Sequence, residues 1–199
     1  KVLQSRGEVG YPYIFFTDNA NNGAADVYKD KNLPIYASNL CTEIMLPSNH
    51  DWSFVCVLSS INVLHYDKWK DTDAVETMIY FLDAVITEFL EKLEVYKNSE
   101  DRDDQQTFLF MERAYNFSKE NRALGMGVLG WHSLLQSKML PFDSQGAYDL
   151  NSEVFKNIKE HSNKASKDLA EKFGEPELLK GYGRRNTTLN AVAPTTSSA

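Results

Sequence analysis

The hydrophobic pattern of the chain changes its period near Asp73, and this change limits what the chain can fold into. From Asp73 to about Tyr96, apolar residues recur every three or four positions, which predicts a long amphipathic helix. Its apolar stripe consists of Val75, Met78, Ile79, Leu82, Val85, Ile86, Phe89, Leu90 and Leu93. Acidic residues such as Asp83 interrupt the stretch, so it is not the run of about 20 apolar residues that crosses a bilayer. Other elements of a folded domain must therefore cover the apolar face.

The segments before and after this helix alternate between strand-like and helical patterns. Short β-branched and aromatic runs bounded by turn residues predict strands, whereas three-to-four spacing predicts helices. The predicted strands cover 11–16, 39–46, 53–58 and 187–193, and further helices are predicted over 108–120, around 125–135 and over 150–169. Gly174 and Pro176 close the last helix. This order, with no internal boundary or repeat, predicts an α/β domain.

Charge and cysteine content argue against several function classes. The chain has 21 Lys and Arg against 28 Asp and Glu, a net charge of −7, and its basic residues are scattered. It lacks the basic footprint that nucleic-acid binding requires, so we expect no nucleic acid and no membrane among its partners. Two cysteines, Cys41 and Cys56, are too few for a disulfide framework and have no zinc spacing. We therefore expect no metal site and a reducing, cytoplasmic setting.

The most suggestive local feature is the run from Ser38 to Glu43. If this run is extended, strand alternation places Asn39, Cys41 and Glu43 on one face, where an amide, a thiol and a carboxylate converge. One interpretation is a site in which the sulfur reacts, Glu43 exchanges a proton and Asn39 holds a hydroxyl. The other is a structural cysteine with two polar neighbours, and the pattern alone favours it because free cysteine is often buried.

Other features are ambiguous by themselves. Cys56 lies in an apolar run with nothing local to activate it, which favours a core thiol. The tail from Ala193 to Ser198 offers hydroxyls and N–H groups to a phosphate, although a turn with a helix cap has the same pattern. The run from Gly125 to Gly130 fits G-x-G-x-x-G but follows a helical segment, so we expect close helix packing and not dinucleotide binding. His161, on an apolar stripe, is expected to be a satisfied core histidine.

Four separated blocks carry the most specific signal in the chain. They are Ser38-Asn39-Leu40-Cys41-x-Glu43; Cys56-x-Leu58-Ser59-Ser60-Ile61-Asn62; Arg122-Ala123-Leu124-Gly125-x-Gly127-Val128; and Arg185-Asn186-x-Thr188-Leu189 through Ala193-Pro194-Thr195-Thr196-Ser197-Ser198. In this order they resemble the large, catalytic subunit of ribonucleotide reductase, and they are most similar to the class I form that acts on ribonucleoside diphosphates. Jointly they are far more specific than any one block.

The resemblance implies a role for each polar residue of the first block. Cys41 matches the cysteine that becomes a thiyl radical and abstracts the 3′ hydrogen of the ribose. Glu43 matches the general base for the 3′-hydroxyl, and Asn39 matches the amide that hydrogen-bonds the sugar hydroxyls. Cys56 matches one of two thiols that reduce the 2′ carbon and end as a disulfide. The implied substrate-binding residues are Ser38, Asn39, Leu40, Cys41, Thr42, Glu43, Pro194, Thr195, Thr196, Ser197 and Ser198.

For the fold, the resemblance implies a ten-stranded α/β barrel whose central finger loop carries the radical cysteine. Residues 1–199 would form part of this catalytic barrel domain, without the N-terminal allosteric domain and the C-terminal part. Because the chain opens on Lys1 and ends directly after an apolar stretch, we interpret it as an internal piece of a longer polypeptide that is inactive alone. No cofactor is expected in this chain, since the metal-containing small (beta) subunit would supply the radical.

The implied partners follow from the same family. They are a ribonucleoside diphosphate substrate, the small radical-generating subunit, the remaining parts of the large subunit, thioredoxin or glutaredoxin as reductant, and a second copy of the full subunit in a homodimer. Two alternatives stay open. An adenosylcobalamin-dependent reductase shares the blocks but makes its radical from the cofactor, and a non-catalytic reductase-like scaffold could retain the fold. A tyrosine pair and a terminal cysteine pair in the flanking sequence would identify class I.

Overall fold

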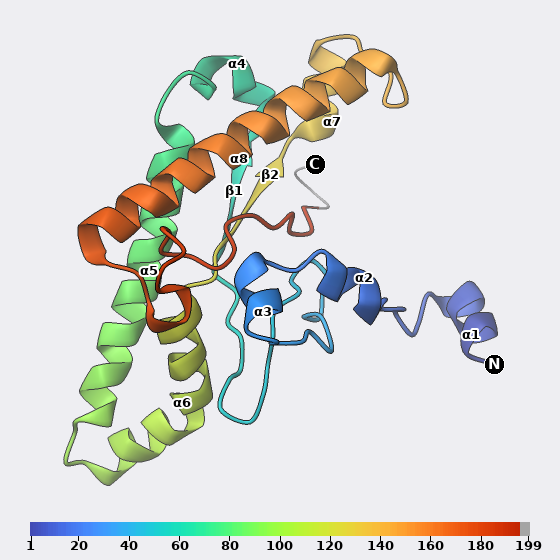
Figure 1. Ribbon diagram of the computed structural model, residues 1–199. Coiled ribbons are helices and arrows are strands. Elements are labelled where there is room, and N and C mark those ends of the chain that lie inside the picture. Colours follow the sequence, from blue (N-terminus) through green and yellow to red (C-terminus); the bar gives the residue numbers. More distant parts are fainter. Residues whose placement is uncertain (196–199) are drawn as a thin grey trace.

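The structure, a computed structural model, describes residues 1–195 as a set of helices around a small parallel sheet (Figure 1). In chain order the elements are α1 (Val2–Val9), α2 (Thr17–Asn22), α3 (Asp26–Asp30), β1 (Leu58–Asn62), η1 (Val63–His65), α4 (Tyr66–Trp69), α5 (Ala74–Lys97), α6 (Arg102–Asn121), β2 (Gly125–Leu129), α7 (Trp131–Ser137), α8 (Gln145–Phe173) and η2 (Glu177–Leu179). In Figure 1, α5 and α6 form a hairpin and α8 crosses the strands. This arrangement confirms the α/β class.

Two strands and one extended segment form the sheet. β1 and β2 pair in parallel, with Leu58 opposite Gly125 and Asn62 opposite Leu129. On the other side of β2, the segment 188–191 runs parallel and forms a bridge at Asn190. The N–H of Met126 donates to the carbonyl of Leu189 at 2.8 Å. The strand predicted over 187–193 is thus present as a short extended segment, and it places residues from the end of the described chain beside β2.

The long helices cover the sheet with the apolar stripes that the sequence predicts. α5 buries Ile79, Leu82 and Ile86, and α8 buries Val154 and Ile158 against the same core. Both helices are amphipathic and pack on each other, so each covers the apolar face of the other. The helix predicted over 108–120 is longer than expected: α6 begins at Arg102 and ends at Asn121. A second cluster forms where the 44–52 loop meets α3, α6 and η2, and its members are Val27, Tyr28, Ile44, Leu46, Trp52, Phe117, Ala123, Leu178 and Leu179.

Of the three strands predicted in the first part of the chain, those over 11–16 and 39–46 are wrong, and the one over 53–58 is displaced toward β1. Residues 11–16 form irregular chain between α1 and α2, with Tyr11 and Phe16 exposed, because no strand of the described chain pairs with them. Residues 39–46 form no strand either: a turn covers 40–42, and the irregular chain that follows buries Ile44 and Leu46. The 53–58 run is mostly irregular, and the strand begins only at Leu58, where β2 supplies backbone partners. The aromatic and β-branched residues therefore indicated where the chain is apolar, but they did not predict which segments pair as strands.

The glycine run 125–130 also differs from its expected structure. It forms β2 and the start of the next turn, so the helix expected around it is confined to α7. A Cβ on Gly127 would overlap the carbonyl oxygen of Ala191, and one on Gly125 would overlap the Leu58 side chain. These glycines allow close approach of neighbouring strands, whereas close helix packing was expected. Within residues 1–195, no helix is long and apolar enough to cross a membrane.

Candidate active site

The Ser38–Glu43 run folds as a tight turn, and this turn brings its polar side chains together. The N–H of Asn39 donates to the carbonyl of Ile44 at 3.1 Å, and the N–H of Ile44 donates to Asn39 Oδ1 at 3.0 Å. Asn39 Nδ2 then donates to Glu43 Oε2 at 2.7 Å. Asn39 and Glu43 therefore meet as expected, but through a turn and not through strand alternation.

Cys41 lies at the tip of this turn. Its side chain is exposed, and the following residue, Thr42, has a positive φ of 65°. A threonine in this left-handed region is uncommon, and its conformation is held by a hydrogen bond from the Thr42 N–H to the Asn39 carbonyl at 3.2 Å. The buried Ile44 anchors the returning limb of the turn in the core. The thiol of Cys41 is therefore exposed to solvent at the tip of a turn that hydrogen bonds and the buried Ile44 hold in place.

Cys56 lies close to the turn in space, although it is separated from it in sequence. It precedes β1 and is exposed in the described chain. Desolvation raises the pKa of the Cys56 thiol, and the negative charge of Glu43 raises it further. Val55 and Val57, on either side of Cys56, line one cavity together with Glu43, so the structure brings this part of the chain beside the turn. A thiol with a raised pKa stays protonated at neutral pH.

Two cavities adjoin the turn. One, of about 540 Å³, is lined by residues from the 13–25 region together with Thr42, Met45 and Thr188. The other, of about 180 Å³, lies between the turn and the sheet, and it is lined by Glu43, Met45, Thr188 and Ala191 among others. Thr188 and Met45 line both cavities. The segment parallel to β2 therefore contributes a wall to the space beside Glu43, a role that the sequence reasoning did not assign to Thr188.

The expected phosphate-binding residues are only partly described. Pro194 and Thr195 follow the segment that runs along β2, and Thr196, Ser197 and Ser198 lie outside the described residues.

Two further expected substrate-binding residues lie in the Cys41 turn. Ser38 donates from its hydroxyl to the Asn39 carbonyl at 3.0 Å, whereas Leu40 is exposed. Ser38 and Leu40 thus belong to the same turn as Cys41.

The histidines and acidic side chains of the described residues do not gather around a common point. Within residues 1–195, no group of three or more His, Cys, Asp or Glu side chains could hold a metal ion. His161 Nδ1 lies 2.9 Å from Glu76 Oε1, so this histidine of the α8 stripe has the expected partner, but its side chain is 30% exposed and lies at the edge of the core.

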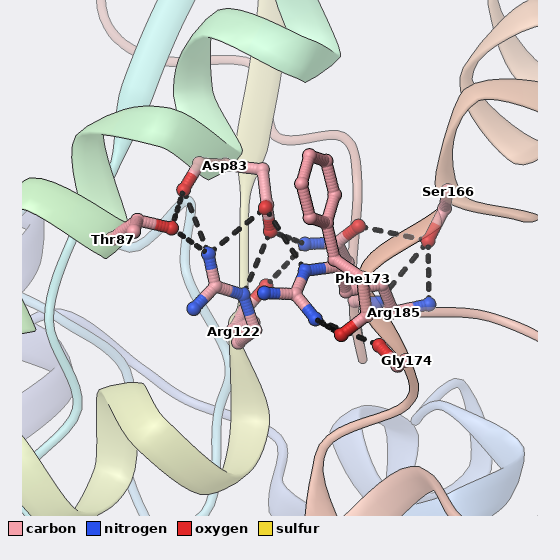
Figure 2. A network of polar contacts seen from close by, with 8 residues as sticks. Asp83, Thr87, Arg122, Ser166, Phe173, Gly174 and Arg185 are labelled. Atoms are coloured by element: carbon pink, nitrogen blue, oxygen red, sulfur yellow. Dashed lines mark hydrogen bonds and ion pairs between the residues drawn. The ribbon is translucent and has the colours of Figure 1, made fainter. Parts of the chain in front are cut away.

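A buried ionic cluster between α5, the end of α6 and residues 185–186 was not predicted. Asp83 of α5 and Arg122, at the end of α6, are both nearly fully buried and form a bidentate ion pair (Figure 2). Burial raises the pKa of Asp83, but hydrogen bonds from Arg122 and Asn186 and the charges of Arg122 and Arg185 outweigh it, so the pKa lies below its usual value. A lone aspartate between Leu82 and the other apolar residues of the α5 stripe was the available signal, because a buried charge requires a partner.

The comparisons with known proteins agree with one another. Residues 1–181 match the family model described as the ribonucleotide reductase barrel domain. The chain is 39% identical over its full length to the putative ribonucleoside-diphosphate reductase large subunit of Frog virus 3, and 32% identical to the corresponding large subunit of Invertebrate iridescent virus 3. Among solved structures, it is similar to the Actinobacillus ureae class Id ribonucleotide reductase alpha subunit, with 55% identity, a TM-score of 0.88 and 98% of the chain covered.

The matches span only part of each relative. The chain covers 33% of the Frog virus 3 protein, 30% of the Invertebrate iridescent virus 3 protein and 35% of the Actinobacillus ureae chain. It therefore spans about a third of the length of the relatives that it matches.

Proposed function

Because the chain belongs to the ribonucleotide reductase family, through its barrel domain, we propose that it supplies the catalytic centre of a ribonucleoside-diphosphate reductase. The complete protein would convert ribonucleoside diphosphates to deoxyribonucleotides for DNA synthesis. The observation that carries the proposal is the turn in which Asn39 Nδ2 donates to Glu43 Oε2 at 2.7 Å and an exposed Cys41 forms the tip, with the neighbours of Cys56 lining the Glu43 cavity.

Cys41 would carry the thiyl radical. An S–H bond is weak enough for sulfur to exchange a hydrogen atom with carbon, so the Cys41 radical takes the 3′ hydrogen of the ribose and later returns it. Glu43 accepts the proton of the 3′-hydroxyl as general base, and Asn39 binds the sugar hydroxyls while it holds the Glu43 carboxylate. The exposed tip of the turn and the adjoining cavity give a ribose access to these groups.

Cys56 would supply one of the two thiols that reduce the 2′ carbon. The 2′-hydroxyl leaves as water, and two thiols provide two electrons and two protons as they form a disulfide. The position of Cys56 supports this role, because its side chain is exposed and its neighbours Val55 and Val57 line the cavity beside Glu43. The second cysteine would come from another part of the complete subunit, since Cys41 is assigned to the radical.

The substrate would lie across the turn and the end of the β2-parallel segment. Hydroxyls and backbone amides of the tail would hold the diphosphate, which fixes the ribose over Cys41. The proposed substrate-binding residues are Ser38, Asn39, Leu40, Cys41, Thr42, Glu43, Pro194, Thr195, Thr196, Ser197 and Ser198. Pro194 and Thr195 continue from the wall of the Glu43 cavity, which supports this placement.

The remaining machinery would come from outside this chain. We expect the rest of the large subunit to complete a ten-stranded barrel and to make the Cys41 turn its central finger loop. A metal-containing small subunit would generate the radical, thioredoxin or glutaredoxin would reduce the Cys56 disulfide, and two full subunits would form a homodimer in the cytoplasm. The 55% identity to a class Id alpha subunit favours this source of the radical over adenosylcobalamin.

The proposal is tested with the full-length subunit that contains this chain, assayed with its small subunit and a dithiol. Formation of deoxyribonucleoside diphosphate is expected, and a substrate carrying deuterium at the 3′ carbon should react more slowly than one carrying deuterium at the 5′ carbon. Absence of product would favour the scaffold interpretation. Equal rates for the two labelled substrates would contradict hydrogen abstraction from the 3′ carbon.

A further inference from the structure

The buried cluster around Asp83 joins three parts of the chain that are far apart in sequence. Arg122 Nε and Nη2 donate to the Asp83 carboxylate at 2.8 and 2.9 Å, and Arg185 Nε donates to its second oxygen at 3.0 Å. Asn186 Nδ2 donates to Asp83 Oδ1 and to the Arg122 carbonyl, both at 2.9 Å. Figure 2 shows Arg122 and Arg185 converging on the carboxylate of Asp83. The Asp83 carboxylate thus connects α5 with the junction between α6 and β2 and with residues 185–186, where the segment 186–191 begins.

Asn186 connects Asp83 to the segment 186–191. It is fully buried, and each polar group of its side chain is used, because its Oδ1 accepts a hydrogen bond from the Ser166 hydroxyl of α8 at 2.8 Å. The Ser166 hydroxyl also accepts from the Asn186 backbone N–H at 3.1 Å. The backbone at residue 186 is therefore fixed from both α5 and α8.

The chain after Asn186 runs directly to the proposed substrate site. Thr187 accepts a hydrogen bond from the buried Tyr28 hydroxyl at 2.8 Å, and Thr188 donates to the Leu124 carbonyl at 3.0 Å. The N–H of Ala191 donates to Met126 at 3.2 Å. Thr188 and Ala191 then line the cavity that contains Glu43. The position of this cavity wall thus depends on where the segment enters at Asn186.

We propose that Asp83 and Asn186 are positioning residues for the substrate site, acting through the segment 186–191 without touching the substrate. This inference rests on the proposed reductase function and adds to it two buried residues outside the Cys41 turn. The cluster sets the register of the segment against β2, which places Thr188 beside Glu43 and aims Pro194 and Thr195 at the substrate. Loss of the contacts that Asn186 makes with Asp83 and Ser166 would shift the wall and weaken substrate binding before it affected the chemistry at Cys41.

The cluster also contains a matched control. Thr87 Oγ1 accepts a hydrogen bond from Arg122 Nη2 at 2.7 Å, so Thr87→Val perturbs the same buried arginine from the α5 side. Within residues 1–195, Thr87 forms hydrogen bonds with Asp83 and Arg122 but none with Asn186 or with the segment that follows. If the cluster acted on stability alone, Thr87→Val and a variant at position 186 would differ only in how far they lowered Tm.

The experiment compares Asn186→Leu, which keeps the side-chain size but removes the amide, with Thr87→Val in the full-length subunit with its small subunit. Asn186→Leu is expected to raise KM for the ribonucleoside diphosphate about tenfold, which corresponds to about 1.4 kcal/mol, and to change kcat much less. Faster amide exchange is expected at 187–191, but not in the Cys41 turn. Thr87→Val should lower Tm and leave KM unchanged.

Ser166→Ala provides a milder perturbation if Asn186→Leu does not fold, and the same rise in KM is then expected to a smaller extent. An unchanged KM for a folded variant at 186 or 166, in a subunit whose wild type is active, would overturn the positioning role. An equal rise in KM in Thr87→Val would overturn it as well. An inactive wild type would instead refute the proposed function, so the two failures are distinguishable.

Discussion

Replacing Gly127 with alanine is expected to separate β2 from the segment 188–191. A Cβ at this position would overlap the carbonyl oxygen of Ala191 and would lie 3.2 Å from the Cα of Val192. These are backbone atoms of a hydrogen-bonded segment, so they cannot rotate away as a side chain could. The strands must move apart or the segment must shift.

The size of the effect follows from this geometry. Inserting a methyl group into a closely packed site with no room costs about 1–3 kcal/mol. The cost should appear locally, because the hydrogen bond from the Ala191 N–H to Met126 spans the contact that Gly127 allows. Since about 1.4 kcal/mol is a factor of ten, protection of the nearby amides should fall by about one to two powers of ten.

The measurement is hydrogen exchange with mass spectrometry on the full-length subunit, in peptides that cover 124–128 and 188–191. Gly7→Ala is the control, because no atom lies within 4 Å of a Cβ at that helical position. Alanine is favoured over glycine in a helix by about 0.5–1 kcal/mol, so this variant should exchange no faster than wild type in either region. Unchanged protection in Gly127→Ala would refute the close-approach explanation for the glycine run.

Three other predictions concern the chemistry and the buried charge. Cys56→Ser should stop multiple turnover while the Cys41 radical still attacks the substrate, so release of free base and loss of activity are expected; normal cycling with a dithiol would make Cys56 a structural thiol. Replacing Ser197 and Ser198 by alanine should weaken diphosphate binding by about 1.5–3 kcal/mol for each lost hydrogen bond to the charged phosphate, measured by calorimetry; an unchanged Kd would exclude the phosphate role. The folded pKa of Asp83 lies below its unfolded value of about 3.9, so its stabilising contribution is complete above about pH 4 and is lost as the pH falls through the folded pKa. The Tm difference between wild type and Asp83→Asn should accordingly shrink in acid, and a difference that grows would contradict the assignment.

The sequence was most informative where one element determines its own pattern. The period of Val75, Ile79, Leu82 and Ile86 locates α5 because a helix repeats its buried face through its own geometry. Strand limits depend on a partner instead. The 53–58 run and β1 overlap only at Leu58, because pairing with β2 sets where the strand begins.

In the candidate site, too, local features could be predicted from the sequence, whereas features that depend on packing between distant segments could not. Asn39, Cys41 and Glu43 could be grouped from their spacing, although the turn that groups them depends on hydrogen bonds with Ile44. The proximity of Cys56 and the role of Thr188 arise only when distant segments pack, so local patterns carried no sign of either. Asp83 was visible as a charge within an apolar stripe, but its partners lie 39 and more residues further along the chain.

The central claim is that the sulfur of Cys41 performs the hydrogen abstraction, and turnover by Cys41→Ser tests it most directly. Serine is similar in size, so the full-length variant should bind the ribonucleoside diphosphate with nearly the wild-type Kd. Its O–H bond is too strong to exchange a hydrogen atom with the ribose carbon, so no deoxyribonucleotide should form with the small subunit and dithiol present. Deoxyribonucleotide formation above background by Cys41→Ser would contradict the account and remove Cys41 from the mechanism.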